Sequence, residues 1–286
     1  MARIAVVGSI NMDLVTRTNR RPLPGETVLG RGFEMMPGGK GANQAIAASR
    51  TGAQVAFIGA TGDDLFGAEL RKSLTDNGIG ASGVRTAPGS SGIATIVVDE
   101  DGENTIIVVG GANAELTELS PADLSTIAAA DILLCQLEIP AETVLAAALH
   151  ARENKTLVLL NASPARAVPE QLWPAIDVVV VNEGEAATLG LALAPVPHVL
   201  ITKGGKGATY RGPRGELSHP GIPVEVVDTT GAGDAFMGTL AARWHEGPPT
   251  ALAWACTAGA LATTTFGAAA SIPTADRIER VLQAED

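Results

Sequence analysis

The segment EVVDTTGAGDAFMG, residues 225–238, places Gly231, Ala232 and Gly233 directly before Asp234. Glycine allows backbone conformations and close approaches that other residues do not. Where a helix begins, its first amides have no partner inside the helix and carry the positive end of the helix dipole, so they can bind an anion. Asp234 is then either a helix cap or a base that accepts a proton from a hydroxyl attacking that anion. Phosphoryl transfer requires little beyond such positioning, charge neutralisation and a proton acceptor.

Two other stretches carry polar side chains suited to a ligand with several hydroxyl groups. PGGKGANQAIAAS, residues 37–49, is a glycine-rich turn leading into a predicted helix, with Lys40 and Asn43 as hydrogen-bonding candidates. Asn11 and Asp13 occupy alternate positions of GSINMD, so they share one side of an extended chain. Amide and carboxylate groups suit adjacent hydroxyls. The plainer alternatives are a solvated lysine beside a glycine turn, and an Asx turn after a strand.

Neither glycine-rich segment matches a common nucleotide-binding fingerprint. Residues 37–49 lack the GxxxxGK[ST] spacing of a P-loop. Gly231 and Gly233 are not followed by glycine at position 236, and no ribose-binding acid lies about 20 residues further on. The histidines fall in no recognisable catalytic constellation, and no nucleophile elbow is present.

The elements that must position these residues alternate between apolar runs rich in Val and Ile and helical segments, which predicts βαβ units and a mostly parallel sheet. We expect core strands at residues 4–7, 55–58, 132–135, 157–160, 178–181 and 199–202. We expect helices at residues 41–50, 65–77, 141–153, 234–245, 251–264 and 275–283. A further strand is expected to end with Val224, Val226 and Val227, just before the helix that carries Asp234.

Polar clusters follow the predicted strands, namely GSINMD (8–13), QLE (136–138), NAS (161–163), NEGE (182–185), TKGGKG (202–207) and Asp228. Ligands of open α/β sheets bind at the carboxyl ends of the strands, so these clusters are expected to form one site. Asn182 and Glu185 have the i, i+3 spacing that suits either a divalent ion held through water or a helix cap. TKGGKG offers Thr202 and glycine amides to phosphates, with a hairpin loop as the alternative.

Two segments do not fit the helix–sheet alternation. Residues 14–36 contain RRPLPGETVLGRGFEMM, and residues 91–109 predict a hairpin of two alternating strands around Asp99 to Asn104. Together they predict a small antiparallel sheet outside the main one, which could act as a lid.

Composition and charge disfavour several other classes of function. The 286 residues carry a formal net charge of −11, which disfavours nonspecific binding to nucleic acid or to an anionic membrane. Cys135 and Cys256 lie in apolar surroundings, so we expect buried free thiols in a reducing compartment, and no cysteine pattern indicates zinc. No apolar run has the length of a signal or membrane segment, so we expect a cytoplasmic protein.

Taken together, these motifs resemble those of the ribokinase (PfkB) family of carbohydrate kinases. The likeness covers almost the whole chain, from GSINMD through PGGKGANQA, TGDDLFG, GGANAEL, QLEIP, NASPAR, NEGEA, TKGGKGA and DTTGAGDAFMG to SIP near the end. It implies an α/β fold of three layers with a mostly parallel central sheet and a small antiparallel β lid. Residues 1–286 would form one domain, with lid segments at about 14–36 and 91–109, and the lid would also build a homodimer.

The resemblance also implies a reaction and roles for the residues. The reaction is ATP-dependent phosphorylation of the primary hydroxyl of a pentose. The expected pentose is D-ribose, because GSINMD, GGKGANQA and QLE are most similar to the ribose-phosphorylating members. Asp234 would be the catalytic base, and Gly231, Ala232 and Gly233 would form the anion hole. The residues implied in sugar binding are Asn11, Asp13, Gly38, Gly39, Lys40, Asn43, Glu138 and Asp234.

The implied ligands on the other side of the site are ATP, Mg²⁺ and K⁺. Asn182 and Glu185 would organise magnesium and phosphates, and Thr202, Gly204, Gly207 and Gly233 would line the nucleotide side. The residues implied in binding K⁺ behind the anion hole are Asp228, Thr230, Ala262, Thr265, Gly267 and Ser271.

Three departures from the family pattern and two alternative functions accompany this prediction. Residues 189–198 lack a helix that is usual before the strand leading to the nucleotide loop, so a sheet flank is exposed or a neighbour fills it. Gly184 replaces a more usual Thr, and Cys256 stands where some relatives have a larger polar residue.

The alternative functions are a kinase for another acceptor (a nucleoside, fructose or deoxyribose) and a sugar-binding sensor without catalysis, which an intact Asp234 disfavours.

Overall fold

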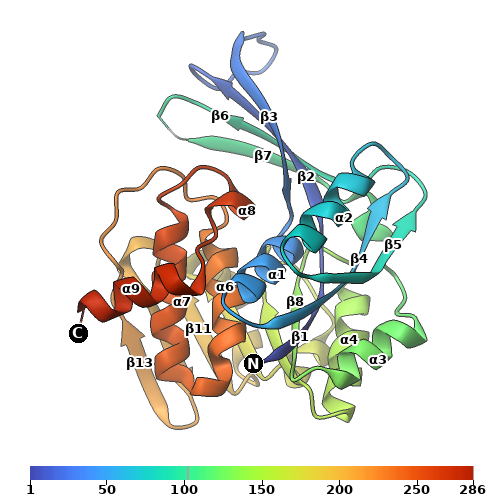
Figure 1. The fold of residues 1–286 in the computed structure, drawn as a ribbon, viewed down its shortest axis with the longest axis vertical. Coiled ribbons are helices and arrows are strands. Elements are labelled where there is room, and N and C mark those ends of the chain that lie inside the picture. The colour runs from blue at the N-terminus through green and yellow to red at the C-terminus, as the bar shows by residue number, and fades with distance from the viewer. Residues whose placement is uncertain (102, 286) are drawn as a thin grey trace.

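A large mixed sheet forms the centre of the computed structural model, which describes residues 1–101 and 103–285 (Figure 1). Residue 102, inside the predicted lid segment, and residue 286, at the end of the predicted domain, lie outside the described residues. The strands run in the order β13 (Gly215–His219), β12 (Ala208–Gly212), β11 (His198–Thr202), β10 (Val178–Asn182), β9 (Leu157–Asn161), β8 (Ile132–Gln136), β1 (Arg3–Val7), β4 (Gln54–Gly62) and β5 (Gly80–Ala87).

Strands β11 to β5 are all parallel, and β12 and β13 add an antiparallel edge. The register places Val6 beside both Phe57 of β4 and Leu134 of β8. All three side chains are fully buried, as expected for central strands of a parallel sheet with both faces covered. The six core strands predicted from the sequence are confirmed as β1, β4, β8, β9, β10 and β11.

Helices cover both faces of this sheet, which gives the three predicted layers (Figure 1). One face packs on α1 (Lys40–Arg50), α2 (Gly67–Asp76), α6 (Ala232–Arg243) and α7 (Pro248–Ala262), with α8 (Ala268–Ser271) beside them and α9 (Ala275–Glu285) packed on α7. The other face packs on α3 (Pro121–Ala129), α4 (Ala141–Glu153) and α5 (Glu183–Leu189). Val6 belongs to the first core and its neighbour Val7 to the second, because successive strand residues point to opposite faces. None of the helices in the described part of the chain has the length and apolarity needed to span a membrane.

A smaller sheet extends away from the main one, in the order β3 (Gly30–Gly38), β2 (Asn11–Thr18), β6 (Gly92–Val98) and β7 (Asn104–Val109) (Figure 1). The pairs β2–β3 and β6–β7 are antiparallel, as the sequence predicted. A parallel pair, β2–β6, joins them and sets Asp13 opposite Ala94. The two segments that broke the α/β rhythm therefore meet in one sheet.

The strand expected to end at Val227 is not present, so that prediction is wrong. Residues 220–229 form an extended loop without ladder pairing. Pro220 and Pro223 lack the backbone N–H that a strand would donate, and Val226 and Val227 are exposed. The amides of Val227 and Asp228 donate instead to the carbonyl of Thr263, just after α7. The strands β5, β12 and β13 and the helices α3, α5 and α8 were not among the elements expected from the sequence.

The short connection at 190–197 covers its own flank of the sheet. After α5 the chain makes one 3-10 turn, η3 (Gly190–Leu193), and enters β11. Leu193 and Val196 are buried against Val199, so they occupy the flank where the sequence led us to expect exposure or a neighbour.

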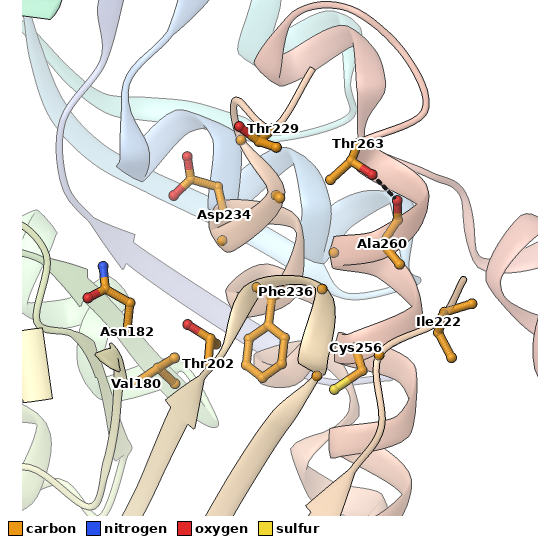
Figure 2. A pocket seen from close by; sticks show the side chains of 18 of the residues that line it. Val180, Asn182, Thr202, Ile222, Thr229, Asp234, Phe236, Cys256, Ala260 and Thr263 are labelled. Atoms are coloured by element: carbon orange, nitrogen blue, oxygen red, sulfur yellow. Dashed lines mark hydrogen bonds between the residues drawn. The ribbon is translucent and has the colours of Figure 1, made fainter. Parts of the chain in front are cut away.

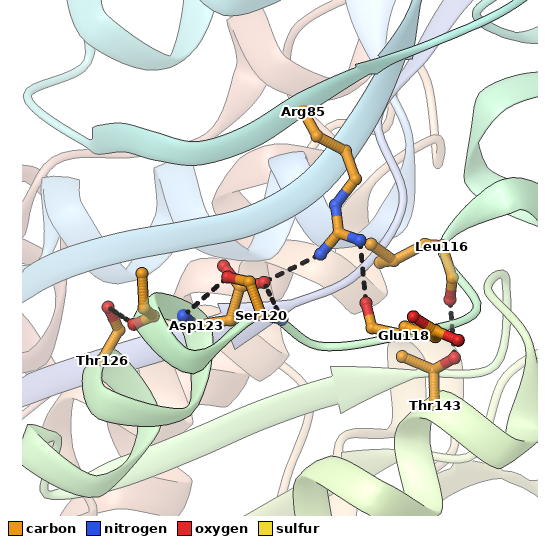
Figure 3. Close-up of polar contacts among 8 residues, drawn as sticks. Arg85, Leu116, Glu118, Ser120, Asp123, Thr126 and Thr143 are labelled. Atoms are coloured by element: carbon orange, nitrogen blue, oxygen red, sulfur yellow. Dashed lines mark hydrogen bonds and ion pairs between the residues drawn. The ribbon is translucent and has the colours of Figure 1, made fainter.

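Helix α3 is fixed to the edge strand β5 by polar contacts (Figure 3). Arg85 of β5 donates to Asp123 of α3 at 2.8 Å and to the carbonyl of Glu118 at 2.8 Å. Asp123 also completes a capping box with Ser120, so one buried carboxylate both starts the helix and binds the strand.

The contact between α1 and α6 predicts the first stability effect. A Cβ on Gly238 of α6 would lie 2.2 Å from the carbonyl oxygen of Gln44 in α1. Gly238→Ala is therefore expected to lower the free energy of unfolding by about 1–3 kcal/mol in urea denaturation, because the helices must separate. Gly233→Ala in the same helix is the control, since a Cβ there meets no protein atom within 4 Å and unfolding should be unchanged or slightly harder. Equal stability of the two variants would contradict this account of the packing.

Candidate active site

Asp234 lies in the first turn of α6 with only 7% of its surface exposed. Both of its oxygens accept hydrogen bonds from consecutive residues of α1. Asn43 donates its amide to Oδ2 at 3.0 Å, and Gln44 donates to Oδ1 at 2.9 Å. The carboxylate is therefore held between two helices, with one donor on each oxygen, and its remaining lone pairs are available to a ligand.

The residues before Asp234 start α6, where backbone amides lack helical partners, although the amide of Ala232 donates to the carbonyl of Thr229 at 3.3 Å. Gly231 caps α6 in the left-handed conformation, with φ 78°, and a Cβ there would lie 2.8 Å from Cα of Ala268. Protein packing does not require glycine at position 233, since a Cβ there would meet no protein atom within 4 Å. The space over Gly233 opens into the cavity described below, so a ligand can approach the backbone closely.

Residues from β2 and α1 assemble on the side of the smaller sheet. Asn11 and Asp13 are buried at the start of β2, where the amide of Asn113 donates to Asn11 at 2.7 Å. Gly38 ends β3, and Gly39, with φ 88°, caps α1. A Cβ on Gly39 would lie only 2.8 Å from the backbone nitrogen of Asn11. The glycine turn thus allows the start of α1 to pack directly against β2.

Glu138 and Lys40 meet at the junction of the two sides. Glu138 accepts from the Ser9 hydroxyl at 2.6 Å and from the backbone amide of Lys40 at 3.1 Å. Burial opposes the charge of Lys40, but the nearby carboxylates of Asp234, Glu138 and Glu185 raise the pKa of its ammonium above the usual value. Lys40 therefore stays protonated and balances part of the negative charge of the site.

Asp13 is the most perturbed carboxyl of this site. Burial raises its pKa from 3.8 to about 7, and repulsion from Glu138 and Asp234 adds to the shift. A carboxyl group in this state accepts a hydrogen bond from a ligand hydroxyl when ionised and donates one when protonated.

A cavity of ≈ 630 Å³ lies on the other side of Asp234 and Lys40 (Figure 2). It is lined by Asn182, Thr202, Phe236, Cys256 and Thr263, among others, with Asp234 at its wall. The predicted nucleotide-side residues that line it are Asn182, Glu185, Thr202, Gly204, Gly207 and Gly233. The predicted sugar-side residues Asn11, Asp13, Gly38, Gly39, Asn43 and Glu138 do not line it, so Asp234 and Lys40 separate two groups of polar residues.

Asn182 and Glu185 form the helix cap that was the alternative to a metal site. Asn182 Oδ1 accepts from the Glu185 amide at 2.8 Å, and Glu185 Oε2 accepts from the Asn182 amide at 2.8 Å. The second carboxylate oxygen of Glu185 is left for a cation or its water, which suits Mg²⁺, since this ion keeps several waters and takes one or two carboxylates.

The predicted K⁺ residues come from the loop before α6, which holds Asp228 and Thr230, and from the segment between the ends of α7 and α8, which holds Ala262, Thr265, Gly267 and Ser271. Asp228 Oδ1 accepts from the Thr230 amide at 2.9 Å, and Oδ2 accepts from the Gly267 amide at 2.9 Å. Ala262 and Ser271 are buried nearby, and Thr265 is exposed. The carbonyl, hydroxyl and carboxylate oxygens of these residues are the ligand type that hard cations prefer.

Four buried polar residues of this region received no individual role from the sequence: Ser9 and Gln136, which belong to the clusters GSINMD and QLE expected at the site, and Gln44 and Asn113. Gln44 stands next to Asn43 in a motif that was recognised, and Gln136 ends a run of apolar strand residues. The thiols of Cys135 and Cys256 are free and buried as predicted, and burial raises the pKa of each to about 12.

Comparison with known proteins assigns the family. A model of the pfkB family carbohydrate kinases matches residues 1–275. The chain belongs to the PfkB family of carbohydrate kinases. This member is 40% identical over 293 residues to the ribokinase of Bacillus subtilis (strain 168), covering 99% of this chain and 100% of that protein.

Two further PfkB relatives are a deoxyribokinase and a ribokinase of known structure. The deoxyribokinase of Salmonella typhi is 36% identical over 261 residues, which cover 83% of this chain and 84% of that protein. The structure of Arabidopsis thaliana ribokinase complexed with ribose and ATP has a TM-score of 0.91, 30% identity and 99% coverage of both chains. The predicted family and fold are thereby confirmed, and the chain is a sugar kinase.

The burial of Asp13 predicts a pH-dependent stability. The pKa of Asp13 is about 7 in the folded chain and 3.8 in the unfolded chain. Between these two pH values the folded state binds more protons than the unfolded state, so stability falls as pH rises from 3.8 to about 7. The whole shift corresponds to about 4 kcal/mol at most. Asp13→Asn removes the titrating carboxyl group. The free energy of unfolding of this variant, relative to wild type, should therefore rise by up to about 4 kcal/mol between pH 4 and pH 8.

Urea unfolding of the unliganded proteins at both pH values measures this difference. Asp276→Asn on the exposed side of α9 is the control, and its difference from wild type should stay constant. A constant difference for Asp13→Asn as well would mean that Asp13 titrates normally.

Proposed function

We propose that this chain transfers the γ-phosphoryl group of ATP to the primary hydroxyl of D-ribose, giving D-ribose 5-phosphate and ADP. The observation that carries the proposal is the position of Asp234. It lies at the start of α6, between the open cavity and the buried polar residues of β2 and α1. The ribokinase relatives, one of them solved with ribose and ATP, support this choice of acceptor and donor.

In this reaction Asp234 accepts the proton of the sugar hydroxyl. The hydroxyl oxygen forms a bond to the γ-phosphorus while the bond to ADP breaks. The amides of Gly231, Ala232 and Gly233 stabilise charge on the transferred group, and such donors each contribute on the order of 10²–10³ in rate. Asn43 fits the role of sugar ligand, because its buried Oδ1 has no partner among the described residues and can accept a sugar hydroxyl.

On the sugar side, Asn11, Asp13, Gly38, Gly39, Lys40 and Glu138 would bind the remaining hydroxyls. On the nucleotide side, Asn182, Thr202, Gly204 and Gly207 would contact ATP in the cavity. ATP is a cytoplasmic metabolite, so the proposed reaction agrees with the cytoplasmic location expected from the sequence.

Two cations complete the proposed site. Mg²⁺ would be held near Glu185 and neutralise phosphate charge. K⁺ would be held by Asp228 and Ser271 with carbonyls of Thr230, Ala262, Thr265 and Gly267, and its charge would support the anion site from behind. Asp228 already joins the backbone at Thr230 to that at Gly267, so a cation there would act on the turn that carries Gly231.

Deoxyribose is the second candidate acceptor, because a deoxyribokinase is among the relatives. The two sugars differ in one hydroxyl, so side chains that bond this hydroxyl decide between them. A sensor without catalysis is disfavoured by the two hydrogen bonds that hold Asp234.

The first experiment measures ADP release from ATP and Mg²⁺ with ribose, deoxyribose, fructose or adenosine, each with and without K⁺. We expect turnover with ribose that K⁺ increases, and a fall of about 10²–10⁴-fold in Asp234→Asn because the proton acceptor is lost. Asp276→Asn should turn over like wild type.

Other outcomes revise the proposal in defined ways. Turnover with a different acceptor would keep the kinase and discard ribose. Full activity of Asp234→Asn would remove its role as base, and sugar binding without any turnover would favour the sensor.

The smaller sheet supports a proposed homodimer. Its outer face carries Phe33 and Met35 of β3 and Ile107 and Val109 of β7, each at least half exposed. The register brings Met35, Leu14, Thr95 and Ile107 into one row on this face. Met35 and Ile107 are the exposed apolar members of this row, and with Phe33 and Val109 they form a patch of the kind that marks an association surface.

Sedimentation equilibrium tests this surface. Wild type is expected to sediment as a dimer and Ile107→Lys as a monomer, because an unpaired charge would be buried in the contact. Leu191→Lys is the matched control, since Leu191 is 91% exposed on the distant η3 turn. A monomeric wild type, or a dimer that survives Ile107→Lys, would exclude this surface.

A further inference from the structure

Gln44 connects Asp234 to two further side-chain amides, that of the buried Gln136 and that of Asn161, which lines the cavity. The Gln44 side chain has no exposed surface and does not itself line the cavity. Its Nε2 donates to Asp234 Oδ1 at 2.9 Å and to Asn161 Oδ1 at 3.1 Å. Its Oε1 accepts from Gln136 Nε2 at 2.8 Å. These amides therefore form a row that runs from the end of β8 through α1 to the carboxylate of α6.

These bonds leave the Gln44 amide one orientation. Both protons of Nε2 are used, and each points to an oxygen atom. If the amide were reversed, its carbonyl oxygen would face the Asp234 carboxylate and its nitrogen would face the nitrogen of Gln136. The Asp234 carboxylate, which can only accept, thus fixes which end of Gln44 faces it, and Gln136 donates to the oxygen that remains.

We infer that Gln44 and Gln136 are positioning residues for phosphoryl transfer, which hold the Asp234 carboxylate in the rotation that accepts the substrate proton. Asn43 bonds the other oxygen of Asp234, so the two donors together fix the plane of the carboxylate. The inference rests on the proposed function, because the rotation matters only if Asp234 meets a hydroxyl.

Stability alone does not account for Gln136. Its side chain is completely buried, and Oε1 has no partner among the described residues. An unsatisfied buried acceptor lowers stability, and an apolar side chain of the same length would avoid that cost. The chain also keeps glycine at position 8, where a Cβ would lie 2.0 Å from this oxygen. The one bond that Gln136 does make goes to Gln44, which leaves orientation of Gln44 as its contribution.

The test compares Gln44→Met and Gln136→Met with wild type, using the acceptor that gives the highest turnover. We expect kcat to fall about 10- to 100-fold in Gln44→Met and about three- to tenfold in Gln136→Met, since small displacements of a reacting group have effects of this size. KM for sugar and ATP should change less than about twofold, because neither side chain contacts a ligand. In an Asp234→Asn background, both substitutions should lose their effect on kcat.

Thr239→Val is the matched control for loss of a buried polar group. Thr239 lies in α6 with Asp234, is 1% exposed, and its hydroxyl has no partner among the described residues. Its kcat should equal that of wild type. If Gln44→Met kept the wild-type kcat, or changed only the unfolding temperature and KM, the positioning role would be wrong.

A second measurement separates this inference from the proposed function, since it needs no turnover. In NMR spectra, Asp234→Asn should shift the side-chain amide signals of Gln44 and Gln136 and leave that of the exposed Gln54 in place. Unmoved signals of Gln44 and Gln136 would overturn the row of bonds. Shifted signals in a protein without kinase turnover would keep the row of bonds but overturn its role in phosphoryl transfer along with the proposed function.

Discussion

The close contact of α1 with α6 determines where the chemistry of this chain takes place. Gly238 lets the two helices approach until the backbone of Gln44 touches α6. At this separation, the amides of Asn43 and Gln44 reach the carboxylate of Asp234 one turn earlier in α6. A larger separation would leave a buried carboxylate without donors, which costs far more than a lost surface bond. Packing and the position of the proposed base are therefore set by the same contact.

The site concentrates negative charge where water is scarce. Asp13, Glu138 and Asp234 lie close enough to repel one another, and burial adds to the cost. Lys40 and the start of α6 provide the balancing positive charge. Such an arrangement is unfavourable for an empty protein and favourable once hydroxyl groups of a ligand bond to the carboxylates. The free energy stored there is consistent with a binding site, since a purely structural role would be served better by apolar residues.

The sequence predicted the parts of the fold that depend on periodicity and on local motifs. Buried strands such as Val178–Asn182 and the glycine turns before Lys40 and Asp234 were identified, because their residue types allow few other structures. The loop at 220–229 was mistaken for a strand, since its valines outweighed the effect of Pro220 and Pro223. The amide row from Gln136 through Gln44 to Asp234 depends on side chains 92 and 190 positions apart meeting across helices and sheet. No local pattern contains that information, and only the folded chain shows it.

The way the smaller sheet is attached has a mechanical consequence. Asn11 and Asp13 belong to β2, whereas Asp234 belongs to α6 of the main layers. Any tilt of the smaller sheet against those layers changes the distance between these proposed sugar-binding groups and the proposed base in a single motion. The two halves of the site then cannot open independently, so the affinity for the sugar and the shielding of the reacting atoms from water change together. A chain built this way couples the residence time of its acceptor to the protection of its donor from hydrolysis.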